Sequence, residues 1–260
     1  MTTLIFRSTS GKYMSMKLKV IGSSPAWPNP GGAHSGYLLV SGDDRLLLDC
    51  GPGVLPRLRE AEEWPRVDAI AITHFHLDHW GDLVPWVWGS MYRATNGKAP
   101  LRPTLWVYEG GRAHLEQLGA RLGFPDMFER QFELAEYRGE EPFEAAGFEV
   151  LPVRLPHYTL ETYGFRVSRD DVTLAYSGDS GPSERLADLA RDVDLFVCEA
   201  TLLTGEADGL PRGHLSLDEA LEAHRAANAR RLLVTHRPAE LPVENGYELA
   251  YDGLELDLSR

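Results

Sequence analysis

The chain has 260 residues, 43% of them hydrophobic and 25% charged, which is the composition of a folded globular protein with a sizeable core. Its 26 Lys and Arg residues against 39 Asp and Glu residues give a formal net charge of −13, and this weighs against long-range capture of nucleic acid or of an anionic membrane. No apolar stretch approaches the roughly 18 residues that a membrane-spanning helix needs, so a soluble protein is expected.

The N-terminal segment predicts where the folded domain begins, and the two cysteines predict the location of the protein in the cell. The first strand pattern begins at Met16, so residues 1–15 are expected to be a disordered extension and residues 16–260 a single domain. The only apolar core of the extension is residues 4–6, which is too short for a secretion signal. Cys50 and Cys198 lie within or beside apolar runs, which predicts buried thiols and a cytoplasmic location rather than a disulfide scaffold.

The predicted elements begin with strands and continue as strands alternating with helices. Apolar runs and period-two patterns predict strands at 17–21, 37–40, 45–49, 68–73, 104–108, 148–155, 165–167, 172–176, 194–198 and 231–235. Helical patterns cover 55–63, 112–122, 183–191 and 217–227, and a hairpin is expected around Asp252-Gly253. No linker or repeat interrupts this order, so one α/β domain with mixed sheets is predicted.

Four residues of metal-binding types lie just past the ends of four separate predicted strands. They are His74, His157, Asp179 and His236. Ligands bind α/β sheets at the carboxyl ends of strands, because loops converge there over a rigid base. Each residue alone has a structural explanation, but histidines scattered through a core would not share this position. The four are therefore candidate ligands as a set.

The stretch from His74 to His79 is the densest group of such residues. Alternation places His74 and His76 on one side of an extended segment, while Asp78 and His79 project elsewhere as the chain enters a helix. A zinc-like ion takes about four or five ligands and, when catalytic, keeps one position for water, so one ion cannot easily use all four side chains. The stretch predicts two half-sites, and a polar turn is the weaker alternative.

Residues later in the chain are expected to complete these half-sites. His157 would complete the first and His236 the second, and Asp179 would bridge both because its two oxygens can each bind a different ion. Two divalent ions are therefore predicted, with zinc favoured and manganese or iron also compatible with a His/Asp set. Purely structural ions are less expected, because structural zinc sites are closed and rich in cysteine.

These residues carry a family resemblance. Residues 74–79 read H-x-H-x-D-H, the signature of the metallo-β-lactamase superfamily, which the chain resembles over about residues 17–258. Its other motifs appear in order as Leu48-Asp49-Cys50-Gly51-Pro52-Gly53, His157, Ser177-Gly178-Asp179-Ser180 and Thr235-His236. The resemblance implies a four-layer αββα sandwich of the α/β class, with a dinuclear site at one edge of two packed sheets. It also implies that Asp49 orients the metal-binding loop from behind the ligands.

Two further motifs resemble the ribonuclease Z-like phosphodiesterase branch. They are Cys198-Glu199-Ala200-Thr201 and Gly213-His214-Leu215-Ser216. Ser216 and Glu219 form an S-x-x-E capping box, which places His214 beside a helix N-terminus, where phosphate binds readily. His214 and Ser216 are therefore expected to contact substrate, and His214 to neutralise phosphate charge or to protonate the leaving oxygen. A capped helix with a neighbouring histidine is the alternative.

The predicted reaction is hydrolysis of a phosphodiester of modest size, such as a cyclic nucleotide or a short nucleic-acid-derived substrate. Two ions would activate a shared water for attack on phosphorus, and Asp78 would ligate one ion and orient that water. The segment between His157 and Asp179 is too short for the arm that ribonuclease Z enzymes insert there to grip tRNA. Processing of tRNA 3′ ends and a large nucleic-acid partner are therefore less expected.

Several alternatives stay open. A lactone, thioester or β-lactam hydrolase would use the same ligands, and a mononuclear-iron sulfur dioxygenase also carries H-x-H-x-D-H. A glutamate in place of one histidine of H-x-H marks the family's di-iron oxidoreductases, so His76 argues against these. Aromatic residues at near-helical spacing are assigned to the site entrance, to the face of a homodimer or to the core: Trp80, Trp86, Trp88 and Tyr92.

Overall fold

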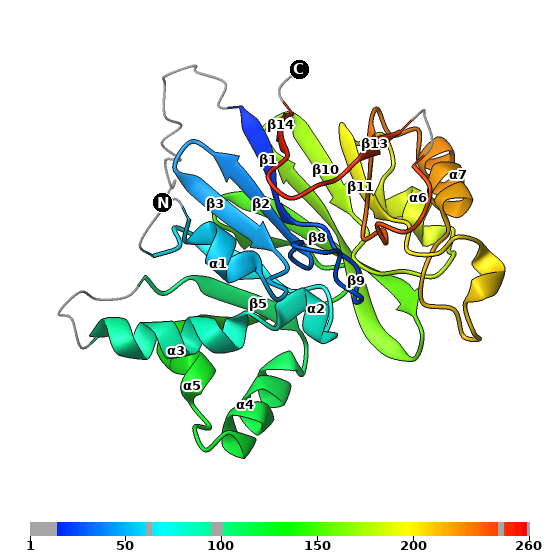
Figure 1. Ribbon diagram of the computed structural model, residues 1–260. Coiled ribbons are helices and arrows are strands. Elements are labelled where there is room, and N and C mark those ends of the chain that lie inside the picture. The colour runs from blue at the N-terminus through cyan, green and yellow to red at the C-terminus, as the bar shows by residue number, and fades with distance from the viewer. Residues whose placement is uncertain (1–14, 61–63, 95–100, 244–246, 259–260) are drawn as a thin grey trace, which may run out of the picture.

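The computed structural model describes the chain at 15–60, 64–94, 101–243 and 247–258 (Figure 1). The strands are β1 (Met16–Gly22), β2 (Gly36–Ser41), β3 (Asp44–Leu48), β4 (Ala69–Ala71), β5 (Thr104–Tyr108), β6 (Glu133–Tyr137), β7 (Phe143–Ala145), β8 (Phe148–His157), β9 (Leu160–Arg169), β10 (Val172–Tyr176), β11 (Leu195–Glu199), β12 (Leu232–Thr235), β13 (Glu248–Leu249) and β14 (Glu255–Asp257). The helices are α1 (Val54–Leu58), α2 (Leu77–Trp80), α3 (Leu83–Ala94), α4 (Gly111–Arg121), α5 (Met127–Gln131), α6 (Arg185–Leu189) and α7 (Leu217–Ala227), with a 3₁₀ turn η1 (Gly205–Ala207). The extension expected at 1–15 lies outside the described residues except for its last one.

Two seven-stranded mixed sheets form the centre of the molecule. The first has the order β14-β1-β2-β3-β4-β5-β6 and the second the order β13-β12-β11-β10-β9-β8-β7. In the first sheet β1, β2 and β3 are antiparallel neighbours, and β3 to β6 are parallel. In the second, β7 to β10 are antiparallel and β10 to β13 parallel.

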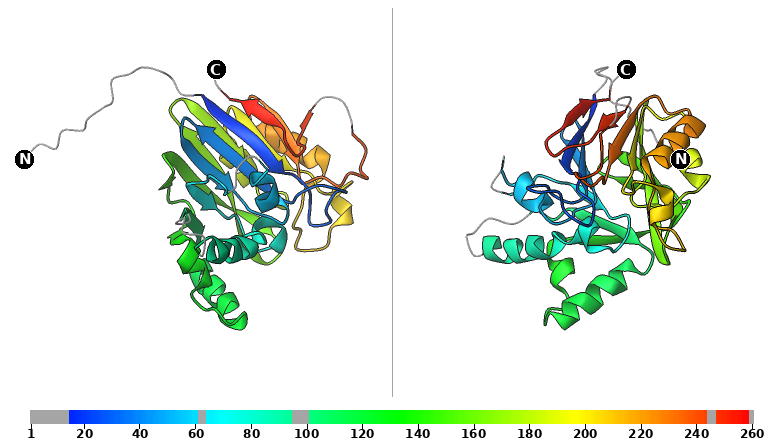
Figure 2. Two further views of the ribbon diagram at one scale, coloured as in Figure 1. Left: turned by 60° about the vertical axis from the view of Figure 1, so that its left-hand side comes forward. Right: turned by 45° about the vertical axis from the view of Figure 1, so that its right-hand side comes forward.

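The buried side chains form three hydrophobic cores, because side chains that alternate along a strand point to opposite faces of its sheet. Leu46 and Leu48 of β3 face the core between the sheets, whereas Leu47 faces an outer core that contains residues of α1, α3 and α5. A third core lies between the second sheet and the helices α6 and α7. Strands covered on both faces are apolar throughout, which explains the unbroken apolar runs in the sequence. The views of Figure 2 show this layering, and the predicted αββα sandwich is confirmed.

The strand ends that carry the candidate ligands meet at one edge. Strand β9 is antiparallel to both β8 and β10, and β10, β11 and β12 are parallel, so β8, β10 and β12 run in the same direction. In the first sheet, β4 leads directly to Thr73 and His74. The backbone N–H of Tyr163 in β9 donates to the carbonyl of Thr73, which ties the two sheets together at this edge.

Several predicted boundaries differ from the structure. The helix expected at 55–63 ends at Leu58, the helix expected at 183–191 covers only Arg185–Leu189, and the strand expected at 68–73 covers only Ala69–Ala71. Strand β9 is longer than the predicted 165–167, and α3, α5, β6 and β7 were not predicted.

The prediction of a hairpin around Asp252-Gly253 is wrong. A turn is present there, with Gly253 at a φ of 91°, but β13 pairs with β12 in the second sheet while β14 pairs with β1 in the first. The Asp252 carboxylate accepts the backbone N–H groups of Ser23 and Ala33. Because β14 pairs with β1, at the other end of the chain, the local turn pattern could not reveal the crossing between sheets.

The burial of side chains tests two further predictions, one for the cysteines and one for the aromatic residues. Cys50 and Cys198 are buried free thiols, as predicted. Trp80 and Trp86 are buried in the outer core of the first sheet and Trp88 packs against it, so these three belong to the core. The side chain of Tyr92 lies outside the described part of the chain. Among the described residues, no helix combines the length and apolarity that a membrane crossing requires.

Candidate metal centre

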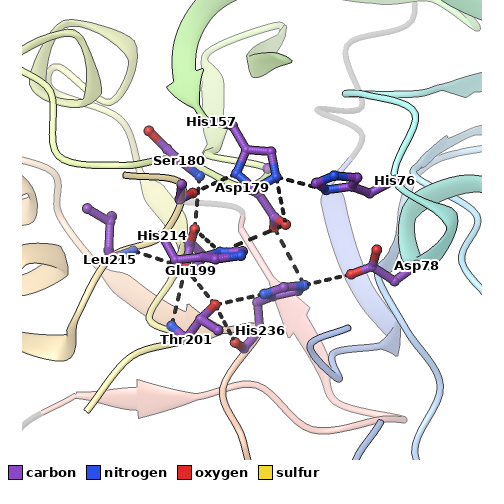
Figure 3. A network of polar contacts seen from close by, with 12 residues as sticks. His76, Asp78, His157, Asp179, Ser180, Glu199, Thr201, His214, Leu215 and His236 are labelled. Carbon is purple, nitrogen blue, oxygen red and sulfur yellow. Dashed lines mark hydrogen bonds and ion pairs between the residues drawn. The ribbon is translucent and has the colours of Figure 1, made fainter. Parts of the chain in front are cut away.

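Three imidazoles converge on one point from separate elements. His74 follows β4, His76 precedes the first residue of α2, and His157 ends β8. The Nδ1 atom of His76 lies 2.9 Å from Nε2 of His157 (Figure 3), and the His74 ring centroid is 4.9 Å from both of these rings. With Asp179, these residues offer ligand atoms that all lie within 4.8 Å of one another. The structure thus brings together the residues predicted for the first half-site.

The second predicted half-site is equally compact. Asp78 and His79 lie on α2, and His236 follows β12 with a φ of 53°, a left-handed conformation that is uncommon for a histidine. Oδ2 of Asp78 lies 3.2 Å from Nε2 of His236 and 3.6 Å from Nε2 of His79. These side chains and Asp179 also offer ligand atoms within 4.8 Å of one another.

Asp179 lies between the two half-sites and presents one oxygen to each. Its Oδ2 atom is 3.8 Å from Nε2 of His74 and 3.8 Å from Nε2 of His157. Its Oδ1 atom is 3.2 Å from Nε2 of His79 and 3.5 Å from Nε2 of His236. This is the geometry that a carboxylate shared between two cations requires.

The buried polar atoms of this cluster fit divalent cations. Nε2 of His74, Nε2 of His79 and Oδ1 of Asp179 are buried and make no hydrogen bond. An unpaired buried polar atom costs about 1–3 kcal/mol, so three of them facing one small space call for a ligand. Neutral imidazoles and carboxylates are the donors that zinc, manganese and iron accept in proteins.

Burial and neighbouring charges shift the histidine pKa values differently in the two half-sites. Burial lowers the pKa values of His74, His76 and His157, so these imidazoles are neutral and keep a lone pair for a cation. Burial also disfavours a charged His79, but neighbouring carboxylates, Asp179 foremost, raise its pKa well above the usual value. A cation held among these carboxylates would replace the positive charge that the proton on His79 otherwise provides.

Asp49 lies behind the ligands, where the family resemblance placed it. Its fully buried carboxylate accepts hydrogen bonds from Nδ1 of His79 at 2.7 Å, from the Tyr176 hydroxyl at 2.8 Å and from the Thr73 backbone N–H at 2.8 Å. The Thr73 hydroxyl also lies 3.0 Å from Nδ1 of His74. A proton held on Nδ1 of His79 leaves the Nε2 lone pair directed at the centre, so Asp49 fixes both tautomer and ring orientation.

A second buried carboxylate, Glu199 at the end of β11, connects His214 with His236 (Figure 3). Oε1 of Glu199 accepts from Nδ1 of His214 at 2.9 Å and from the Ser180 backbone N–H at 2.9 Å. Oε2 accepts from the Thr201 hydroxyl at 2.7 Å, and that hydroxyl oxygen lies 2.9 Å from Nδ1 of His236. A hydroxyl carries one proton. Since the Thr201 hydroxyl donates its proton to Glu199, it accepts a hydrogen bond from Nδ1 of His236.

His214 lies beside both half-sites. Its ring is stacked on that of His236 with centroids 5.7 Å apart, and its Nδ1 atom is 4.0 Å from Oδ2 of Asp179. Burial alone would lower the pKa of His214, but the carboxylates of Glu199 and Asp179 raise it to about 9. Cations bound at the centre would oppose this rise through the same Coulombic effect.

The capping box predicted at Ser216 is present. The Ser216 side chain accepts from the Glu219 backbone N–H, and the Glu219 side chain accepts from the Ser216 backbone N–H at the first turn of α7. The Ser216 hydroxyl also donates to Oε2 of Glu219 at 3.0 Å, so it is engaged within the helix cap. Substrate contact by His214 and Ser216 stays a prediction.

The sequence singled out Glu199 and Thr201 within the motif Cys198-Glu199-Ala200-Thr201 but gave neither a role, and it did not single out Thr73. Glu199 also follows the strand predicted at 194–198, so it meets the strand-end criterion that selected His74. The roles of Thr73 and Thr201 depend on hydroxyl contacts that become visible only once the partners are placed.

Comparisons with known proteins define the class to which this fold and centre belong. A family model described as "Beta-lactamase superfamily domain" matches residues 44–237. The chain therefore belongs to the β-lactamase superfamily, and it is a metallo-hydrolase of that fold. Divalent metal ions are implied by the fold, in agreement with the His/Asp clusters described above.

Individual relatives narrow the class further. The chain is 30% identical over 223 residues to the "Probable metallo-hydrolase YhfI" of Bacillus subtilis, covering 86% of this chain and 87% of the relative. The crystal structure of YhfI superposes with a TM-score of 0.82 at 24% identity, covering 94% and 99% of the two chains. Human tRNase Z, short form, gives 0.72 at 22% identity (94% and 100%), and a diphosphatase of the PhnP family gives 0.73 at 23% identity (93% and 97%). The fold is thus close to the ribonuclease Z-like branch.

Proposed function

We propose that this protein is a phosphodiesterase that uses two divalent metal ions, zinc foremost. The observation that carries the proposal is the placement of Asp179, which presents one oxygen to each histidine-rich half-site. His214, held by Glu199 beside both half-sites, adds a group suited to a phosphate. Two of the similar structures are those of a tRNase Z and of a diphosphatase, and this supports the proposed substrate class.

The geometry supports the proposed ligand sets. One ion would be held by His74, His76 and His157, the other by Asp78, His79 and His236, and both by Asp179. Divalent ions at these positions would supply an activated water near neutral pH and would stabilise negative charge on the phosphate oxygens.

Two side chains are assigned to proton and water handling. Burial raises the pKa of Asp78, but the imidazoles of His79 and His236 lower it by more, so this carboxylate stays ionised and can accept a hydrogen bond from the attacking water. His214 is held by Glu199 through Nδ1, and it is assigned to neutralise phosphate charge or to protonate the leaving oxygen.

A substrate of modest size suits this chain. Between His157 and Asp179 the chain forms only β9, β10 and their connections, and the pairing of Arg169 with Val172 shows a tight turn between the two strands. An inserted arm that could grip tRNA is absent from this segment, all of which the structure describes. A cyclic nucleotide or a short nucleic-acid-derived phosphodiester is therefore proposed. A cytoplasmic location and a homodimer stay predictions.

Removal and replacement of the metal tests the proposal. Purified protein stripped with a chelator should lose turnover of bis(p-nitrophenyl) phosphate and regain it with zinc, manganese or iron, and metal analysis should find up to two ions per chain. A panel with a lactone, a thioester and a β-lactam tests the other hydrolases. Oxygen uptake on a persulfide with iron bound tests a sulfur dioxygenase. Turnover of one of these substrates, with no phosphodiester cleavage, would refute the proposal.

The role of His214 is tested by substitution. His214→Ala should depress phosphodiester cleavage while metal content stays unchanged, because Nδ1 of His214 is held by Glu199 and the side chain belongs to neither of the two proposed ligand sets. General acid catalysis contributes about 10²–10⁴-fold, which sets the scale of the expected loss if His214 protonates the leaving oxygen. His224→Ala, on the outer helix α7, is the matched control. Wild-type activity in His214→Ala would remove the phosphate assignment.

A further inference from the structure

Residues 208–214 form the segment that carries His214. This segment is held by the end of β8, the strand that also supplies His157. Nδ1 of His157 donates to the carbonyl of Gly213 at 2.6 Å, and the backbone N–H of Tyr158 donates to the carbonyl of Arg212 at 3.3 Å. The hydroxyl of Tyr158 donates to Oδ1 of Asp208 at 3.2 Å. Three contacts from two consecutive residues therefore fix this segment against the metal centre.

Asp208 accepts hydrogen bonds from backbone N–H groups within the same segment. Its Oδ2 atom accepts the backbone N–H of Gly213 at 2.8 Å and that of His214 at 3.1 Å, and Oδ1 also accepts the N–H of Gly209 at 2.9 Å. Partial burial opposes ionisation of Asp208, but these hydrogen bonds lower its pKa below the usual value. The ionised carboxylate thus anchors the backbone of His214 itself, while Tyr158 anchors the carboxylate.

The ring of Tyr158 completes this arrangement. A Cβ atom added to Gly213 would lie 2.3 Å from a ring carbon of Tyr158, so only glycine allows the ring to lie on this backbone. The Tyr158 ring centroid is 4.8 Å from that of His157 and 5.6 Å from that of His214. Tyr158 has a φ of 48°, a left-handed conformation that costs energy in a non-glycine residue and persists where the surrounding contacts enforce it.

We propose that Tyr158 and Asp208 are positioning residues that hold His214 where it can protonate the leaving oxygen of a phosphodiester. The inference rests on the proposed function and adds two residues outside the predicted ligand sets. Without the Asp208 carboxylate, the N–H groups of Gly213 and His214 lose their acceptor, and the His214 ring can move away from Glu199 and the centre. The effect should therefore depend on how much the leaving group needs a proton.

Leaving-group dependence separates this role from a merely structural one. Asp208→Ala and Tyr158→Phe are compared on two phosphodiesters, one that releases nitrophenolate and one that releases an alkoxide. Asp208→Ala, which removes both acceptor oxygens, should lower kcat on the alkyl ester by about tenfold or more, a fraction of the full effect of a general acid, and lower it far less on the nitrophenyl ester. KM and metal content should stay near wild type. Tyr158→Phe, which keeps the ring, should show the same pattern with a smaller loss.

Two controls make the result specific. Asp171→Ala makes the same chemical change on an exposed carboxylate between β9 and β10 and should behave as wild type. In a His214→Ala background, Asp208→Ala should cause no additional loss, because positioning residues act only through the residue they position. Equal losses on both esters, or a full additional loss in the His214→Ala background, would overturn the proposal.

A readout without turnover keeps this inference separate from the proposed function. Hydrogen exchange should show protected Gly213 and His214 amides in the metal-loaded wild type and in Asp171→Ala, and faster exchange in Asp208→Ala, which removes the acceptor of both amides. The ¹⁵N signal of His214 Nδ1 should show its hydrogen bond to Glu199 in the first two proteins and lose it in Asp208→Ala. Unchanged amides and an unchanged imidazole signal would refute the positioning role even if the enzyme cleaves phosphodiesters. Failure of the wild type to cleave any phosphodiester would refute the assigned reaction step, whatever these signals show.

Discussion

Glu199→Gln probes the buried network beside the metal centre. The wild-type carboxylate is fully buried and accepts hydrogen bonds on both oxygens. Oε1 accepts from the Ser180 N–H and from Nδ1 of His214, and Oε2 accepts from the Thr201 N–H, the Thr201 hydroxyl and the Leu215 N–H. Every one of these partners donates, so the position requires two acceptor oxygens.

The magnitude follows from counting the acceptors that glutamine lacks. If the glutamine oxygen takes the place of Oε2, its NH₂ group faces the Ser180 N–H and Nδ1 of His214, and two donors lose their acceptor. At about 1–3 kcal/mol for each unpaired buried group, the free energy of unfolding should fall by about 2–6 kcal/mol. If His214 gives up its Nδ1 proton and accepts from the amide instead, only the Ser180 N–H loses its acceptor, and the fall should be about 1–3 kcal/mol. Turnover should fall in either case, because His214 is then displaced or neutral.

Urea unfolding of the metal-free protein measures this loss without a contribution from bound ions. Glu222→Gln, an exposed carboxylate on α7, is the control and should change stability by no more than about 0.5 kcal/mol. Because whole domains are stable by only about 5–15 kcal/mol, the Glu199→Gln loss should be plain in the unfolding midpoint. A Glu199→Gln stability equal to that of the control would show that the network does not hold this edge together.

Three further substitutions test the centre and its surroundings. Asp179→Ala should lose at least one ion and nearly all turnover, because its oxygens face both half-sites, and full metal occupancy with activity would contradict the bridging role. Asp49→Asn should weaken metal binding by about 10–100-fold in a chelator competition, since it disturbs the hydrogen bond to His79, and an unchanged affinity would count against that support. Ser216→Ala should lower the free energy of unfolding by about 1 kcal/mol with metal content unchanged, and no loss would mean that the capping box contributes nothing.

The strand-end residues were predictable because the relevant information is local. Apolar runs stop sharply before His74 and His236, and the structure places both at the same edge of the sandwich. The alternation of His74 with His76, and the separate direction of Asp78 and His79, follow from strand and helix geometry over a few residues. The S-x-x-E capping box at Ser216 is equally local, and it is present as predicted.

Contacts between distant segments could not be predicted in this way. The joining of His214 to His236 through Glu199 and Thr201 depends on hydrogen bonds of about 3 Å, and a sequence pattern has no such resolution. The Asp208 contact with Tyr158 depends on a loop that folds back onto β8. The last strands show the same limit, because β13 and β14 join different sheets although only one turn separates them in the sequence.

The sequence by itself predicted which residues could bind metal and that they divide into two half-sites, and its resemblance to the metallo-β-lactamase superfamily implied the sandwich of two sheets and the supporting position of Asp49. The tertiary structure alone decided which oxygen of Asp179 faces which half-site, and that Glu199 joins His214 to His236 through Thr201. The physical reason is that residue type and spacing are encoded locally, whereas the direction of a hydrogen bond is set only when segments far apart in the chain pack against one another.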